Sequence, residues 1–73
     1  MARVEVESEV AGTVWKLVAA VESDLARGDP ILILESMKME IPVEAPAAGR
    51  LIELRVSEED PVEEGQVIAI LET

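Results

Sequence analysis

An internal repeat constrains this 73-residue chain more than any other feature of its sequence. A shift of 37 positions places Gly12 on Gly49 and Gly28 on Gly65. The same shift superimposes further identical pairs: Val6 on Val43, Glu7 on Glu44, Ala11 on Ala48, Leu17 on Leu54, and Ile31, Ile33, Leu34 and Glu35 on Ile68, Ile70, Leu71 and Glu72. Repeated units bury their apolar faces against one another. We therefore interpret residues 1–73 as one domain with an internal repeat. Its halves are 1–36 and 38–73, and they meet about Lys38.

Each half has the residue pattern of β-strands. Apolar and polar residues alternate in several segments, which is typical of half-buried strands. Short apolar runs bounded by Gly or Pro predict buried strands. An Ala-Gly pair that suits a turn or a bulge precedes one strand candidate in each half. The predicted strands are 4–7, 13–18, 31–34, 37–44, 50–56 and 67–71, and the segments rich in turn residues are 22–30 and 57–66.

These strands predict an all-β fold. We expect two matching halves of about four short strands each to close into a flattened β-barrel or sandwich. Such a barrel-sandwich hybrid has two four-stranded sheets and a pseudo-twofold axis. Residues 31–41 leave one alternative open, a helix with Asp29 as N-cap and Pro30 at its first position. Strands are favoured because Pro42 would end the helix and the equivalent segment 67–71 is too short for one.

Composition limits the chemistry that the chain can perform. It has no His and no Cys, which excludes Ser-His-Asp and Cys-His catalysis, disulfides and zinc sites of the usual ligand types. The formal net charge of −10 opposes binding to nucleic acid and to anionic membranes. Charged residues near the N-terminus and short apolar runs predict neither a signal peptide nor a membrane span. We expect a cytoplasmic, non-catalytic domain without a metal site.

A cluster of carboxylates occupies residues 58–64. Its members are Glu58, Glu59, Asp60, Glu63 and Glu64. The spacing lacks the alternating Asp or Asn and the central Gly of a calcium-binding EF-hand loop. We interpret the cluster as a solvated face, with docking of a basic partner as its other possible use.

The middle of the chain predicts a hairpin. If 31–36 and 39–44 run in opposite directions, Met37 and Lys38 form a two-residue connection, and Lys38 lies at an exposed tip. Such turns prefer Asn-Gly or Asp-Gly, so local preference disagrees with this geometry, as is expected at functional sites. Lys16 is the only other lysine, and we expect it to solvate a strand face.

The run Glu35-Ser36-Met37-Lys38-Met39 resembles the attachment sequence of biotin carboxyl carrier domains, in the biotinyl/lipoyl-attachment family. The duplicated halves, the Ala-Gly turns and the Gly-Asp before the hairpin extend the likeness over the whole chain, although Ser36 stands where Ala is more common. The resemblance implies that Lys38 carries biotin through its ε-amine, as N6-biotinyllysine. It also implies that a biotin protein ligase or other partners read the flanking residues, which are Glu35, Ser36, Met37, Met39 and Glu40.

The resemblance further implies a free-standing carrier of a multi-subunit biotin-dependent carboxylase. In such systems a biotin carboxylase loads the carrier and a carboxyltransferase unloads it onto an acceptor, often an acyl-CoA, as in acetyl-CoA carboxylase. An ordinary lysine amine is protonated at neutral pH, so the ligase must supply an activated acyl group and remove the proton. Two alternatives remain: a lipoyl carrier, which typically has Asp-Lys-Ala at its tip, and an unmodified barrel that serves as an interaction module.

Overall fold

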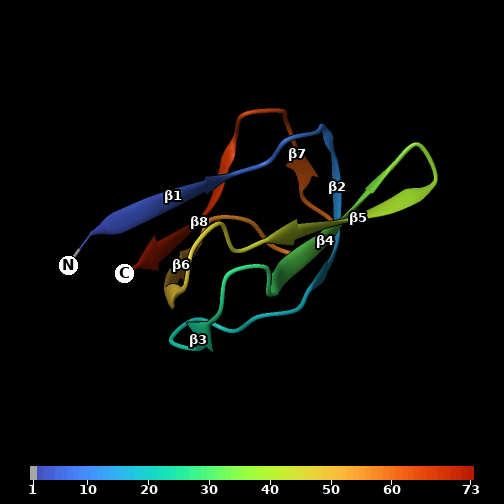
Figure 1. Cartoon of the computed structure of the whole chain (residues 1–73). Helices are drawn as coiled ribbons and strands as arrows, with labels where there is room; N and C mark the ends of the chain where they lie inside the picture. Colours follow the sequence, from blue (N-terminus) through green and yellow to red (C-terminus); the bar gives the residue numbers. More distant parts are fainter. Residues whose placement is uncertain (1) are drawn as a thin grey trace.

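The computed structural model describes residues 2–73 and consists of two four-stranded antiparallel sheets (Figure 1). Sheet A has the strand order β1-β8-β6-β3, and sheet B has the order β5-β4-β2-β7. This arrangement confirms the predicted all-β fold. The strands are β1 (Arg3–Glu7), β2 (Gly12–Leu17), β3 (Asp24–Leu25), β4 (Pro30–Ser36), β5 (Met39–Glu44), β6 (Gly49–Leu54), β7 (Pro61–Val62) and β8 (Val67–Glu72). Within the described residues no helix is long and apolar enough to cross a membrane.

The contacts between strands recur at the spacing of the sequence repeat. The amide of Gly28 donates to the carbonyl of Ala45 at 2.9 Å, and the amide of Gly65 donates to that of Ser8 at 2.8 Å. Both glycines have positive φ, 91° and 84°, so both turns require the left-handed region. Strands β1 to β4 precede Lys38 and β5 to β8 follow it, and each sheet takes two strands from each group. The two halves of the chain therefore interlock.

Aliphatic side chains fill the space between the two sheets. Alternate residues of each long strand point inward, and the resulting core contains Val6, Val14, Leu32, Leu34, Val43, Leu51, Ile68, Ala69 and Leu71. Ser8 is the one buried polar side chain in the described part, and its Oγ donates to the carbonyl of Val10 at 2.6 Å. Burial of aliphatic surface from both sheets is what closes so short a chain into one unit.

The structure corrects some of the predicted element boundaries. The helix alternative for 31–41 is wrong, since β4 and β5 occupy this segment as an antiparallel pair. Residues 37 and 38 form a turn, so the strand predicted for 37–44 begins at Met39. The turn-rich segments contain the two-residue strands β3 and β7, which close the edges of the sheets. Two residues are too few to produce a periodic pattern, so sequence alone did not predict them.

Candidate functional site

The connection between β4 and β5 is a two-residue turn made of Met37 and Lys38. The antiparallel register pairs Ser36 with Met39 and Glu35 with Glu40, so the ladder continues up to the turn. The φ angles are 51° at Met37 and 65° at Lys38. Positive φ at both central residues is the requirement of a type I′ hairpin turn, whose twist matches that of the strands. The geometry therefore places two ordinary side chains in a conformation that glycine and asparagine prefer.

Replacing Met37 by Asn and Lys38 by Gly is expected to stabilise the folded chain. A residue with a Cβ pays about 1–2 kcal/mol in the left-handed region, and Asn-Gly avoids most of this cost. We expect the free energy of unfolding to rise by about 1–2 kcal/mol, measured by urea denaturation. An unchanged or lower urea midpoint would show that the native turn is not strained.

The side chains at the tip are open to solvent. Met37 is 93% exposed and Met39 is 63% exposed, so neither thioether packs over the end of the barrel. Lys38 is exposed, and the ion pairs found within residues 2–73 involve Arg50 and Arg55 rather than Lys38. The ε-amine is thus available to an approaching protein. Lys16, by contrast, is exposed in the middle of strand β2.

The two faces of the hairpin differ chemically. Glu35 and Glu40 lie directly opposite each other, both exposed, on the face that points away from the core. Ser36, which is partly buried, and Met39 form the next cross-strand pair and point to the other face. Like charges in direct opposition are unfavourable for the strand pair. The tip therefore offers an acidic pair on one side of Lys38 and a thioether on the other.

The hairpin projects from the body of the molecule on the side away from the chain ends (Figure 1). The ends are joined at the far side, where the amide of Thr73 donates to the carbonyl of Ala2 at 2.8 Å and the amide of Ala2 donates back at 3.2 Å. Chain added at either end would thus begin far from Lys38.

Two carboxylates of the acidic cluster 58–64 accept hydrogen bonds from backbone amides. Glu58 Oε2 accepts a hydrogen bond from the amide of Leu17 at 3.3 Å, and Asp60 Oδ2 accepts one from Ser57 at 2.8 Å. Across residues 2–73, no three carboxylates lie close enough together to hold a metal ion. Asp60 therefore stabilises its own turn, Glu58 connects this turn to β2, and Glu63 and Glu64 are exposed.

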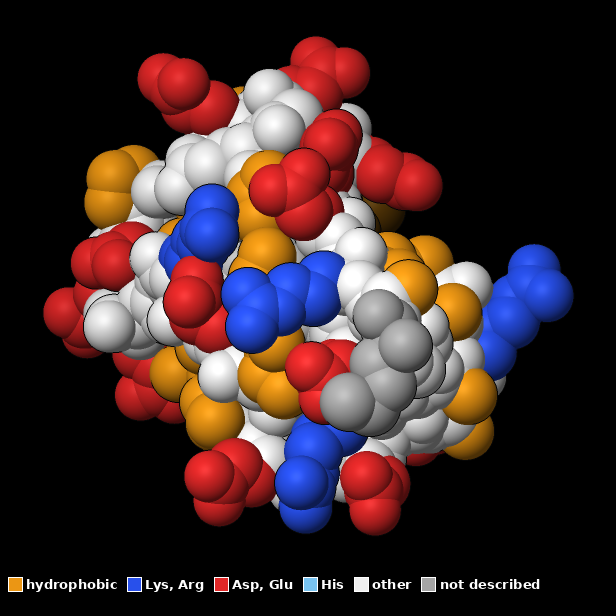
Figure 2. Space-filling model, turned by 90° about the vertical axis from the view of Figure 1, so that its left-hand side faces the viewer, with side chains coloured by type: hydrophobic (Ala, Val, Ile, Leu, Met, Phe, Trp, Pro, Cys, Tyr) orange, Lys and Arg blue, Asp and Glu red, His pale blue; other side chains and the backbone are white. Residues whose placement is uncertain are grey.

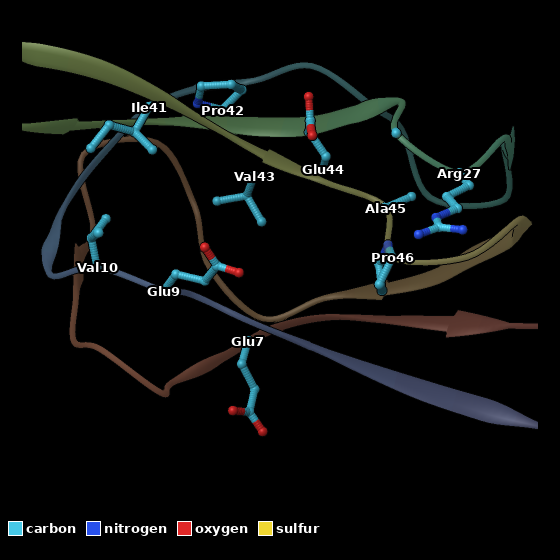
Figure 3. A pocket seen from close by; sticks show the side chains of 11 residues that line it. Glu7, Glu9, Val10, Arg27, Ile41, Pro42, Val43, Glu44, Ala45 and Pro46 are labelled. Atoms are coloured by element: carbon cyan, nitrogen blue, oxygen red, sulfur yellow. The ribbon is translucent and has the colours of Figure 1, made fainter.

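A groove of about 420 Å³ runs along the free edge of β5 (Figure 3). Ile41 and Val10 lie at one end of it and Arg27 at the other, and carboxylates of Glu7 and Glu9 also line it. Its lining contains neither Lys38 nor any Ser, Thr or Cys side chain. The tip, and not this groove, is the place where the chain presents a reactive group.

Known proteins similar to this chain include two of nearly the same length. A family model described as "Biotin-requiring enzyme" matches residues 7–71. The chain is 37% identical over 67 residues to the biotinylated protein TB7.3 homolog of Mycobacterium leprae, which covers 92% of this chain and 94% of that protein. It is 40% identical over 63 residues to the biotin/lipoyl attachment protein of Bacillus subtilis, covering 86% of each.

The chain is also similar to small parts of much larger proteins. It is 37% identical over 68 residues to urea amidolyase of Saccharomyces cerevisiae, which is 93% of this chain but 4% of that protein. The solved structure of Kluyveromyces lactis urea carboxylase superimposes with a TM-score of 0.92 at 34% identity, covering 97% of this chain and 6% of that one. The chain thus spans a small fraction of these relatives.

Proposed function

The chain belongs to the biotin/lipoyl family of biotin-requiring enzymes, and on that premise we propose that it is the biotin carboxyl carrier of a biotin-dependent carboxylase. Family membership confirms the resemblance drawn from residues 35–39. Biotin is the covalently attached cofactor of such carriers. We propose Lys38 as the attachment residue. The observation that carries this assignment is its place at the exposed two-residue turn of the projecting hairpin.

The surroundings of Lys38 fit a covalent acyl group. The side chain is exposed, and no ion pair described for residues 2–73 holds its amine. In the proposed step the protonated amine first gives one proton to the ligase, and Nζ then attacks the carbon of an activated carboxyl group. The bond to the activating group breaks, that group leaves with the bonding electrons, and Nζ gives up a second proton as the amide forms. The sheet pairing of β4 and β5 keeps the base of the hairpin rigid, while the four-carbon stem of Lys38 gives reach.

Bound biotin would accept a carboxyl group at one enzyme site and release it at another. In this role the chain presents the Lys38 amine at an exposed turn. It does not shield the attached group from solvent, and it contributes no acid or base to the transfer. Tethering supports this role because an attached cofactor visits two sites without dissociating. We propose biotin protein ligase, a biotin carboxylase and a carboxyltransferase as partners, on separate subunits in the cytoplasm.

The flanking residues are proposed as the recognition sequence for these partners. Met37 and Met39 are exposed thioethers that adapt to differently shaped surfaces. Glu35, Ser36 and Glu40 complete the sequence, and the two carboxylates suit a basic partner surface. We propose an acyl-CoA as the acceptor, the class named in the methylcrotonoyl-CoA carboxylase of Arabidopsis thaliana.

Intact-mass measurement tests the proposed function. We expect the chain, when produced together with a biotin protein ligase, to gain the mass of one biotinyl group and to be captured by avidin. A gain of one lipoyl group would instead identify a lipoyl carrier. An unshifted mass in the presence of active ligase would identify an unmodified interaction module, and either result would contradict the proposal.

A further inference from the structure

A partner that acts on Lys38 needs more surface than the turn provides. A stable protein interface covers about 800 Å² on each partner, whereas two turn residues offer a small part of that. The whole described chain exposes 4704 Å². The hairpin continues into sheet B through β4 and β5, so the outer face of sheet B is continuous with the tip.

The outer face of sheet B exposes apolar side chains at its centre. Pro42 lies opposite Ile33, and Ile33 lies opposite Lys16 on β2. The ladder slips between Val14 and Lys16, and this bulge directs Trp15 outward, where it is 48% exposed. Val18 is 45% exposed just beyond the strand. We name the apolar residues Trp15, Val18, Ile33 and Pro42 the Trp15 face.

The repeat provides an internal control for this surface, because sheet A has the same bulge at Ile52. The central residue equivalent to Ile33 is Ile70, which is 6% exposed and lies opposite Glu5 and Glu53. Arg55, which is equivalent to Val18, forms an ion pair with Glu53. Its Nε donates a hydrogen bond to the Glu53 carboxylate, and this hydrogen bond raises the pKa of Arg55. In sheet A the central isoleucine is therefore buried between charged neighbours, so the fold does not require an exposed apolar centre on its outer faces.

Charged side chains on and beside sheet A form two ion pairs within the molecule. Arg50 also lies 3.9 Å from the carboxylate of Asp24. Viewed from the side of the chain ends, acidic and basic side chains are interleaved (Figure 2). The five large apolar side chains exposed in the described part of the chain lie outside the strands of sheet A; they are Trp15, Val18, Val21, Met37 and Met39. The exposed large apolar side chains of the described residues thus lie at the tip, on β2 and in the segment that follows β2.

We propose that the Trp15 face docks on the biotin protein ligase while Lys38 occupies the ligase active site. This inference rests on the proposed function. Tryptophan is among the residues most enriched at the positions that dominate the binding energy of protein interfaces. Glu35 and Glu40 flank the face toward the tip, and Glu58 flanks it beside Leu17.

The charge around the face selects the class of partner. An acidic rim is complementary to a surface whose apolar centre is bordered by Arg and Lys. A second copy of this chain would oppose the same carboxylates with its own, at a net charge of −10 each. Of the proposed partners, the ligase acts on the Lys38 amine itself, without the reach of an attached biotin, so we expect the matching surface on the ligase.

Biotinylation kinetics with purified biotin protein ligase, biotin and ATP test the docking surface. Trp15→Ile places at the bulge the residue that the equivalent bulge in sheet A already carries, so the chain is expected to remain folded. We expect KM for the carrier to rise about tenfold or more with kcat unchanged. Ile52→Ala is the matched control on the other sheet and is expected to change KM less than about twofold.

A second measurement observes the face directly. The chain has a single Trp, so the ¹⁵N-labelled carrier gives one indole signal, which is expected to shift when unlabelled ligase is added. An unchanged KM for Trp15→Ile, or an equal rise for Ile52→Ala, overturns the docking proposal alone. An indole signal that shifts with carrier concentration in the absence of ligase assigns the face to self-association and also overturns it. Failure of the ligase to modify the wild-type chain refutes the proposed function itself.

Discussion

Replacement of Lys38 by Arg is expected to leave the chain folded and to abolish its biotinylation. Arginine keeps the positive charge and the long stem but lacks a primary amine that can form the amide. Because the side chain is exposed, no core contact is lost and the urea midpoint should stay unchanged within error. The measurement is the intact mass after production with biotin protein ligase, together with capture on avidin.

Lys16→Arg is the matched control for this experiment. Lys16 is the only other lysine of the chain, is also exposed and lies within β2 instead of in a turn. We expect this variant to gain one biotinyl group, as the wild-type chain does. Modification that survives in Lys38→Arg and disappears in Lys16→Arg would place the attachment site on Lys16 and contradict the assignment of Lys38.

The repeat made the fold predictable because it set two independent constraints. Alternation over residues 4–7 and 37–44 identified half-buried strands, and the matching of the two halves implied that each covers the apolar face of the other. In the structure each sheet accordingly contains strands from both halves. The position of the turn at 37 and 38 followed from the same pattern, since the strands on either side were recognisable.

The remaining features depend on contacts that leave no local pattern. Strands β3 and β7 exist because a neighbouring strand pairs with two residues of a turn segment. The exposure of Trp15 depends on a bulge in the ladder between β2 and β4. An isolated Trp between Val and Lys reads as an ordinary strand residue. The sequence repeat aligns Trp15 with Ile52, and this difference between the halves could have identified Trp15 as unusual.

Gly12→Ala is expected to be among the most destabilising single substitutions in this chain. A Cβ at position 12 would lie 2.6 Å from the carbonyl oxygen of Glu35 and 3.3 Å from Cβ of Ser36. The oxygen belongs to the backbone, so β2 and β4 must separate at the base of the hairpin. Overpacking of this kind costs about 2–3 kcal/mol, a large part of the stability of so small a domain. Urea denaturation measures the loss.

Two other glycines separate the steric effect from the conformational one. A Cβ added at Gly28 would meet no atom within 4 Å, but the backbone there has a φ of 91°. Gly28→Ala is therefore expected to lower the free energy of unfolding by only about 1–2 kcal/mol. Gly49→Ala repeats the clash of Gly12, at 2.8 Å from the carbonyl oxygen of Glu72. Because this separation is longer than the 2.6 Å at Gly12, the cost should be smaller. If Gly12→Ala proves no more destabilising than these two, β4 is not held rigidly at the base of the Lys38 turn.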